Sequence, residues 1–381
     1  MNNPFVYGEI AVGKAFVGRK EELADIARGL QAGERIFLIS PRRFGKTSLI
    51  VNLLERLKNK GLMTAYIDLY RAASLEQLAA LFAEEVLLKS ETRLETLARL
   101  AREIVPLLRP KITVEQDGQF SAALDIGKSK SEQSAALAEL FDAAEKIAKK
   151  RGKRLVIAFD EFQEATALGG EPLEKLMRSV FQGHHNVSYI FSGSKQHLIA
   201  DMVNNKDRAF YKLGRVLFLG KIPEKDLRVF ITERFAAMGA TVDEAAFRRI
   251  LSEADSIPYY VQYLCSFLWN KCREGAGLSE KLVAETAAHI ADTQAPLYVG
   301  MLENIPLKQR KILQVVSRNP GEKLYSHEVI ERNRLGPAPT VQVSLNLLIK
   351  KGILEKENGG HVFCDPFFRL WVVKNSLLKS V

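Results

Sequence analysis

The most informative part of the sequence is Arg35-Ile36-Phe37-Leu38-Ile39-Ser40-Pro41-Arg42-Arg43-Phe44-Gly45-Lys46-Thr47-Ser48. It begins with a short apolar run, Ile36 to Ile39, which is followed by a loop that contains proline and glycine. From Lys46 to Lys58 the apolar residues recur at helical spacing, at Leu49, Ile50, Leu53, Leu54 and Leu57. This stretch therefore predicts a strand, a loop and a helix, in that order.

The loop matches most of the phosphate-loop pattern G-x-x-x-x-G-K-[ST]. In that pattern backbone N–H groups face phosphates, the lysine contacts the β and γ charges, and the hydroxyl binds Mg²⁺. Ser40 replaces the first glycine, and a Cβ there disfavours the tightest turn, which predicts weakened nucleotide affinity. The alternative to a phosphate loop is that Gly45-Lys46-Thr47 occurs at the start of this helix by chance. The predicted nucleotide-binding residues of the loop are Pro41, Arg42, Arg43, Phe44, Gly45, Lys46, Thr47 and Ser48.

A second motif lies about 110 residues further along the chain, where the apolar run Arg154 to Phe159 ends in Asp160 and Glu161. P-loop proteins place their Walker B pair at such a strand end. Asp160 is predicted to bind Mg²⁺ together with Thr47, and Glu161 to orient and polarise the attacking water. An acidic helix N-cap after a strand is the alternative interpretation, and the phosphate loop upstream disfavours it.

Alternation of strands and helices in the first half of the chain favours a parallel α/β sheet. The other predicted strands are residues 63–68, 187–191 and 216–219. The polar segment 111–132 predicts a small hairpin about Asp117-Gly118 or a mobile loop. Residues 223–296 have only helical patterns, which predicts a small helical domain.

The last part of the chain has the pattern of a winged helix. Three predicted helices, 307–316, 326–332 and 340–351, precede two β-like runs on either side of Asn358-Gly359-Gly360. In winged helices the third helix enters the major groove of DNA and the wing contacts the backbone. The first part of this helix has the short polar side chains Thr340, Gln342, Ser344 and Asn346. Lysines lie at its end and in the wing, at Lys350, Lys351 and Lys356.

Composition and charge narrow the class of protein. The chain has 381 residues, 47% of them apolar, and a net charge of +10, which indicates a globular protein of two or three domains. Residues 301–381 have 13 Lys and Arg against 7 Asp and Glu, so the predicted winged helix holds +6 of that charge. No apolar run approaches the ~18 residues of a membrane span, and the N-terminus lacks a signal-peptide pattern. We therefore expect a cytoplasmic protein with no membrane partner.

The motifs together resemble the archaeal-type ATPases of the P-loop STAND class, which are relatives of the AAA+ proteins. The resemblance covers nearly the whole chain. It includes Phe16-Val17-Gly18-Arg19 with Glu22, the double arginine before Phe44, and Asp160-Glu161-Phe162-Gln163. It implies that Phe16, Val17, Gly18 and Arg19 line the adenine site, and that ATP and Mg²⁺ are the cofactors.

The resemblance also implies further contacts with the nucleotide. Ser194 lies at the sensor-1 position, and Arg215 follows Gly214 in a pair that is typical of the family, which makes Arg215 a candidate γ-phosphate sensor. The alternative for Ser194 is an ordinary serine in a turn, and the alternative for Arg215 is a solvated arginine without a catalytic role. Pro258 lies in the turn that reaches the nucleotide, but Ser256 replaces the glycine of that turn. The catalytic candidates are therefore Glu161, Lys46, Arg215 and Ser194.

These patterns predict three domains: an ATPase core (1–220), a helical lid (221–300) and a winged helix (301–381). We expect an ATP-dependent molecular switch with slow hydrolysis, because Ser40 and Ser256 replace glycines. A nucleotide-binding scaffold for protein partners and a DNA-binding regulator with a vestigial ATPase are the alternatives. Double-stranded DNA and protein are both candidate partners of the winged helix, and nucleotide-dependent self-association is a further expectation.

Overall fold

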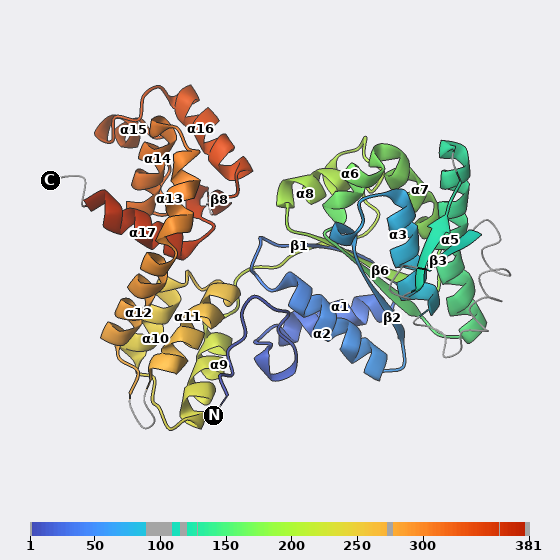
Figure 1. Cartoon of the computed structure of the whole chain (residues 1–381), viewed down its shortest axis with the longest axis horizontal. Coiled ribbons are helices and arrows are strands. Elements are labelled where there is room, and N and C mark those ends of the chain that lie inside the picture. The colour runs from blue at the N-terminus through green and yellow to red at the C-terminus, as the bar shows by residue number, and fades with distance from the viewer. Residues whose placement is uncertain are drawn as a thin grey trace. The chain divides into compact units, whose positions relative to one another are not determined.

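The computed structural model describes residues 2–88, 109–114, 120–127, 129–272, 277–357 and 359–377. It has two compact units. The first unit is Ile10–Gly220, and the second unit combines Met1–Glu9 with Lys221–Val381. Figure 1 shows the elements of both units in the order of the chain. No helix among the described residues is long and apolar enough to cross a membrane.

The first unit is built on a five-stranded sheet with the strand order β2-β5-β6-β1-β7. All neighbouring strands are parallel, so their carboxyl ends lie along one edge. The sequence-based prediction of a parallel α/β sheet is confirmed. The strands are β1 (Arg35–Ile39), β2 (Met63–Asp68), β5 (Leu155–Asp160), β6 (Val187–Gly193) and β7 (Arg215–Phe218).

Helices cover both faces of this sheet (Figure 1). In β1, Ile36 and Leu38 face a core with residues of α1 (Lys20–Gln31) and α2 (Lys46–Asn59). Phe37 and Ile39 face the opposite core, because side chains alternate along a strand. This second core includes residues of α3 (Leu75–Phe82), α5 (Lys130–Arg151), α7 (Gly170–Gln182) and α8 (Gln196–Asn204), and the one-turn helix α6 (Ala165–Leu168) adds Ala165.

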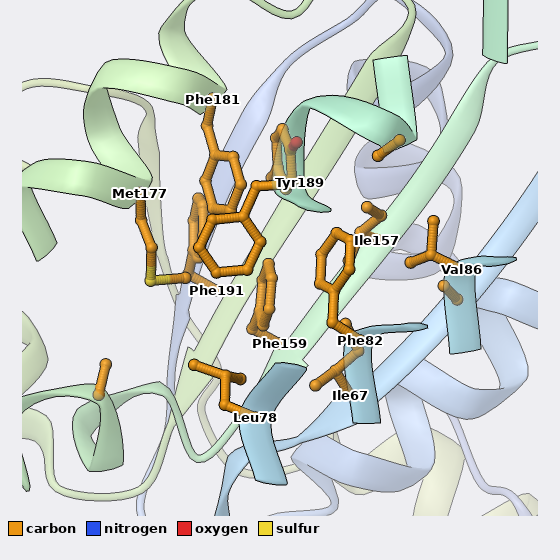
Figure 2. Packing of buried hydrophobic residues seen from close by; sticks show 14 of the residues in the cluster. Ile67, Leu78, Phe82, Val86, Ile157, Phe159, Met177, Phe181, Tyr189 and Phe191 are labelled. Atoms are coloured by element: carbon orange, nitrogen blue, oxygen red, sulfur yellow. The ribbon is translucent and has the colours of Figure 1, made fainter. Parts of the chain in front are cut away.

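The second core contains a group of aromatic side chains that pack on one another (Figure 2). The rings of Phe159 and Phe191 are nearly parallel, at 3°, with centroids 5.8 Å apart. The rings of Phe181 and Tyr189 stack at 4.3 Å. Phe159 is fully buried and directly precedes Asp160, so this packing fixes the end of β5 from which the acidic pair extends.

The remaining elements of the first unit are short. Strands β3 (Arg109–Val114) and β4 (Phe120–Asp125) form an antiparallel hairpin, as predicted. Asp117 and Gly118, about which the hairpin was predicted, lie outside the described residues. The 3-10 and π turns are η1 (Gly13–Ala15), η2 (Leu69–Arg71), η3 (Ala83–Leu88) and η4 (Phe162–Glu164).

Among the described residues of the second unit, the regular structure is helical except for one two-stranded sheet. Its first part has five helices: α9 (Glu224–Ala237), α10 (Glu244–Glu253), α11 (Pro258–Lys271), α12 (Glu280–Thr293) and α13 (Ala295–Glu303). Its second part has α14 (Leu307–Arg318), α15 (His327–Arg332), α16 (Ala338–Lys350), β8 (Leu354–Glu357), β9 (Gly360–Phe363) and α17 (Pro366–Leu377). The pair β8 and β9 is antiparallel, so three helices and a wing follow one another as predicted.

The final helix joins the two parts of the second unit. The ring of Phe368 in α17 lies 5.5 Å from that of Phe363 in the wing and 4.9 Å from that of Tyr298 in α13. Lys374 pairs with Asp292 of α12. Helix α17 therefore packs on the wing, as expected, and on the preceding helices as well, which is why residues 221–381 form one compact unit rather than two.

The first nine residues also belong to this unit, although the sequence analysis assigned them to the core at 1–220. Phe5 is buried, and its ring lies 5.9 Å from that of Phe230 and 6.2 Å from that of Trp269. The amide of Val6 donates a hydrogen bond to Gln262 Oε1 at 3.0 Å. These contacts explain why the chain start groups with the helices after Lys221.

A cluster of charged residues connects the wing with the start of the second unit. Lys221 Nζ lies 3.0 Å from both Asp255 and Glu357. Burial and the nearby Glu357 raise the pKa of Glu355 in β8 to about 7. Lys221 offsets this rise of the pKa only in part, and its ion pairs are with Asp255 and Glu357.

The raised pKa of Glu355 makes stability depend on pH. The unfolded group titrates near 4.3, so between about pH 4.3 and 7 the folded protein binds the extra proton, and stability falls as pH rises through this window. We expect Glu355→Gln to raise the free energy of unfolding at pH 8 by about 1 kcal/mol, after allowance for solvent screening, and to change it little at pH 4.5. Thermal unfolding at both pH values, with the exposed Glu303→Gln as control, checks this. An equal effect at both pH values would contradict it.

Candidate functional site

The loop after β1 places its backbone at the carboxyl edge of the sheet. Ser40 is buried, and its amide donates a hydrogen bond to the carbonyl of Gly193 at 3.4 Å. The left-handed residues of the loop are Arg43 (φ 71°) and Gly45 (φ 84°), whereas Ser40 is outside that region. The Cβ of Ser40 therefore occupies an ordinary backbone conformation, and the strain that the sequence analysis expected there is not present. Arg42 and Arg43 are exposed, Pro41 is half-buried and Phe44 is buried.

The start of α2 meets the end of β5. Lys46 Nζ donates a hydrogen bond to Asp160 Oδ1 and lies 3.3 Å from Glu161 Oε1. Thr47 Oγ1 donates to Asp160 Oδ2 at 2.7 Å. The structure thus brings together the four residues that the two sequence motifs predicted, in one group at the carboxyl edge of the sheet.

Asp160 has further donors that the sequence analysis did not assign. Ser192 Oγ donates to Oδ1 at 2.5 Å, and Tyr66 Oη donates to Oδ2 at 2.9 Å. Ser192 had a signal in the sequence, because it directly follows the predicted strand 187–191 and is two residues before Ser194. Tyr66 had none, since an aromatic residue between Ala65 and Ile67 in a predicted strand indicates only packing.

Glu161 is held on both of its carboxylate oxygens. Oε2 accepts hydrogen bonds from Ser194 Oγ at 2.9 Å and from Gln163 Nε2 at 2.5 Å, while Oε1 faces Lys46. The backbone of Glu161 is left-handed, with φ 50°. Such a conformation costs of order 1 kcal/mol and is found preferentially at functional sites.

Charge and burial shift the pKa values of Asp160 and Glu161 in opposite directions. Burial alone would raise the pKa of Asp160, but Lys46 and the hydroxyls of Ser192 and Thr47 hold that pKa below its usual value. For Glu161, burial is likewise outweighed by Lys46, Gln163 and Ser194, so its pKa is also lowered. Both carboxylates are therefore charged near neutral pH. A charged Glu161 is the form that can accept a proton.

The oxygen atoms of this group fit Mg²⁺. A hydroxyl oxygen of Thr47 and a carboxylate oxygen of Asp160 lie 2.7 Å apart, and hard oxygen ligands are those that Mg²⁺ prefers. In nucleotide sites Mg²⁺ binds through one or two protein oxygens and takes the rest from phosphates and water. Thr47 and Asp160 supply such a set.

The segment before α1 reaches the phosphate loop through Arg19. This residue is buried, and its Nη2 donates to the carbonyls of Phe44 at 3.3 Å and Gly220 at 2.5 Å. Glu22 pairs with its Nη1. Val17 is buried and Phe16 packs beside the α1 and α2 core, with Gly18 between Val17 and Arg19. Ser48 Oγ accepts a hydrogen bond from the amide of Ala11, which ties the same segment to α2.

One predicted residue, Arg215, is not part of this group. Arg215 opens β7, where it is paired in register with Ile36, and it forms ion pairs with Asp25 at 2.8 Å and Glu34 at 3.0 Å. It therefore lies at the amino edge of the sheet, opposite the phosphate loop. Gly214 is required there for packing, because a Cβ would lie 2.2 Å from the carbonyl oxygen of Arg35.

Pro258 belongs to the second unit, where it is the first residue of α11. The two residues before Ile257 are left-handed, Asp255 at φ 51° and Ser256 at φ 52°. Ser256 thus adopts the conformation that favours glycine. The replacement of glycine is strained at this position and not at Ser40.

The fold and this site define the chain as a P-loop ATPase with a C-terminal winged helix. Residues 16–264 match a family described as an ATPase domain predominantly from Archaea, and residues 296–374 match a probable winged helix domain. The chain belongs to this ATPase family.

Solved structures of low sequence identity share the fold. The Walker-type ATPase paby2304 of Pyrococcus abyssi is 16% identical, with 97% of this chain and 99% of that chain covered and a TM-score of 0.66. The ORC2 protein of Aeropyrum pernix in its ADP form is 15% identical, with 99% and 97% covered and a TM-score of 0.52. No curated protein matches the chain.

Proposed function

We propose that the protein is an ATP-dependent molecular switch that hydrolyses ATP slowly with Mg²⁺. The observation that supports this most directly is the meeting of Lys46 and Thr47 with Asp160 and Glu161 at the carboxyl edge of the sheet. Phosphoryl transfer requires a cation, a hydroxyl and charged carboxylates from the protein. In this group these side chains lie within hydrogen-bond reach of one another.

Each residue has a distinct role in this proposal. Lys46 binds the β and γ phosphates, and the backbone N–H groups from Arg42 to Gly45, with those at the start of α2, donate to phosphate oxygens. Pro41, which has no N–H, lines the start of the loop. Thr47 and Asp160 hold Mg²⁺, which neutralises the negative charge of the phosphates. Glu161 orients the attacking water and accepts its proton, with Ser194 beside it.

The N-terminal segment and the lid complete the proposed nucleotide site. Phe16, Val17, Gly18 and Arg19 contact the adenine side, and Arg19 also holds the backbone of the phosphate loop through the carbonyl of Phe44. Pro258 reports the nucleotide state to the helical lid (221–300) and from there to the winged helix (301–381). The strained Ser256 before it favours slow turnover. Arg215 has no role here within its own subunit, because Asp25 and Glu34 bind it at the other edge of the sheet.

The winged helix is the proposed output, and duplex DNA is its first candidate partner. The exposed face of α16 presents Gln342, Asn346 and Lys350, and this part of the chain has a net charge of +6. Ser344 is buried and is therefore excluded from such a contact. Amide side chains and a positive field are both suited to DNA.

A protein partner is the second candidate, and the same helix supports it. Val343 and Leu347 lie one helical turn apart on the exposed face, 59% and 41% exposed. Apolar side chains in such a position are typical of a helix that packs on another protein. On this alternative the protein is a nucleotide-binding scaffold.

One experiment separates these functions. ATP affinity, phosphate release and particle size are measured without nucleotide, with ADP and with a non-hydrolysable ATP analogue, each with and without duplex DNA. The switch predicts Mg²⁺-dependent phosphate release and a nucleotide-dependent change in size or in DNA affinity, with DNA affinity falling steeply as salt is added. Tight ATP binding without phosphate release would support the scaffold. No binding of ATP would exclude both.

A further inference from the structure

We infer that Gln163 is a positioning residue for Glu161: it holds one carboxylate oxygen so that the other faces the phosphate-binding lysine. The inference rests on the proposed ATPase function and assigns a role to a residue outside the two motifs that define the site. Gln163 is in the 3-10 turn η4, two residues after Glu161, and is only 4% exposed.

The two oxygens of Glu161 have different surroundings. Oε2 accepts hydrogen bonds from Gln163 Nε2 at 2.5 Å and Ser194 Oγ at 2.9 Å. Oε1 lies 3.3 Å from Lys46 Nζ. When Lys46 binds phosphate, Oε1 is freed while Oε2 keeps its two donors. The oxygen that then faces the phosphates is the one able to accept a proton from water, and its direction is fixed by the bonds to Oε2.

The orientation of the Gln163 amide follows from its neighbours. Its Nε2 lies 2.5 Å from a carboxylate oxygen of Glu161 and 3.4 Å from one of Glu164. Carboxylates only accept hydrogen bonds, so the NH₂ group, and not the carbonyl oxygen, has to face them. The amide therefore donates to Glu161, and its oxygen is directed to the other side.

That oxygen is packed against the end of β6. A Cβ at Gly193 would lie 2.2 Å from Gln163 Oε1 and 2.8 Å from Ile199 Cγ1, so the amide, together with Ile199, occupies the space of a side chain at position 193. Within the part of the chain that the structure describes, no group donates a hydrogen bond to this buried oxygen. An unpaired buried oxygen lowers stability. Gln163 thus keeps its amide beside Glu161 at a cost to folding, which a packing residue would not require.

Gln163→Met tests this role, because methionine keeps the length and removes both the donor and the unpaired oxygen. We expect kcat for ATP hydrolysis to fall about 10-fold, with KM for ATP and the affinity for a non-hydrolysable ATP analogue within about 2-fold of the parent. Tm without nucleotide should change by only a few degrees, because loss of the hydrogen bond to Glu161 and removal of the unpaired oxygen act in opposite directions. Gln182→Met, at the exposed end of α7, is the matched control and should change none of these values.

A second test uses the contact with Gly193. Gly193→Ala displaces the amide and should lower kcat by a similar factor. In a Gln163→Ala background only the contact with Ile199 remains, so Gly193→Ala should then cause a smaller loss of kcat than in the parent. Equal losses in both backgrounds would show that Gly193 acts independently of Gln163 and would overturn the inference.

The outcomes separate this inference from the proposed function. If the parent hydrolyses ATP, Glu161→Gln is inactive and Gln163→Met retains the parental kcat, the positioning role is overturned and the ATPase stands. A Gln163→Met protein with a lower Tm and an equal loss of ATP affinity would assign Gln163 a structural role only. A parent that binds ATP but releases no phosphate would overturn both.

Discussion

Replacing Glu161 with glutamine is expected to lower the rate of phosphate release by about 100-fold or more, while the affinity for ATP stays within a few-fold of the parent. Glutamine has nearly the same size and can still form hydrogen bonds, but it cannot accept the proton of the attacking water. Turnover of Mg²⁺-ATP and equilibrium binding of ATP, measured on the same preparations, check this.

The matched control is Glu171→Gln, at an exposed glutamate in the first turn of α7 that pairs with Lys175. It makes the same chemical change away from the carboxyl edge of the sheet and should retain parental turnover. A Glu161→Gln protein that hydrolysed ATP at the parental rate would contradict the role of Glu161. Loss of both turnover and binding would instead indicate a structural role.

Replacing Lys46 with methionine is expected to have two large effects. ATP affinity should fall about 100-fold, because a charged hydrogen bond to phosphate is lost. Without nucleotide, the free energy of unfolding at pH 7 should fall by about 3 kcal/mol, since Asp160 is left buried without its cation. Equilibrium binding of ATP and urea unfolding measure the two effects separately.

The pH dependence of the second effect follows from the pKa of Asp160. In the parent Lys46 contributes to holding this pKa below its usual value, so the stabilisation is complete above about pH 4 and is lost only as pH falls below it. In Lys46→Met burial raises the pKa instead, and the variant regains stability as its carboxyl takes up a proton. The difference between the two proteins should therefore be smaller at pH 5 than at pH 7. A difference that does not change with pH would contradict this account.

Local patterns were sufficient to predict most of the fold. Residues Met63–Asp68 were predicted as a strand from their local sequence pattern, and the structure has a strand with the same bounds. This strand is partly buried on both of its faces. The grouping of residues 2–9 with the second unit could not be predicted in the same way. Phe5 contacts Phe230 and Trp269, and contacts over more than 200 residues leave no periodic signal in a single sequence.

The candidate site was predictable where a motif fixes position and chemistry together. Lys46, Thr47, Asp160 and Glu161 are of this kind, because each directly follows the end of a strand or begins a helix. Arg215 was assigned from its place after Gly214, but sequence order does not tell at which edge of the sheet a strand begins. Tyr66 contacts Asp160 through tertiary packing, and its pattern was that of a core strand. Gln163 contacts Glu161 within one local turn. It was part of the family resemblance but had no assigned role.

The chain passes between the two compact units twice, after Glu9 and after Gly220. If the backbone is cut at one of these two crossings, the other crossing still connects the two units. A protein with one such cut therefore keeps its units at the high local concentration of a tethered pair. The unit Ile10–Gly220 is one continuous segment, whereas a fragment that begins at Lys221 lacks Phe5 and leaves Phe230, Phe235 and Trp269 without their partner ring. We therefore expect that the ATPase half can be isolated by simple truncation. The winged-helix half needs the segment before Ile10 supplied as well, in trans or by circular permutation.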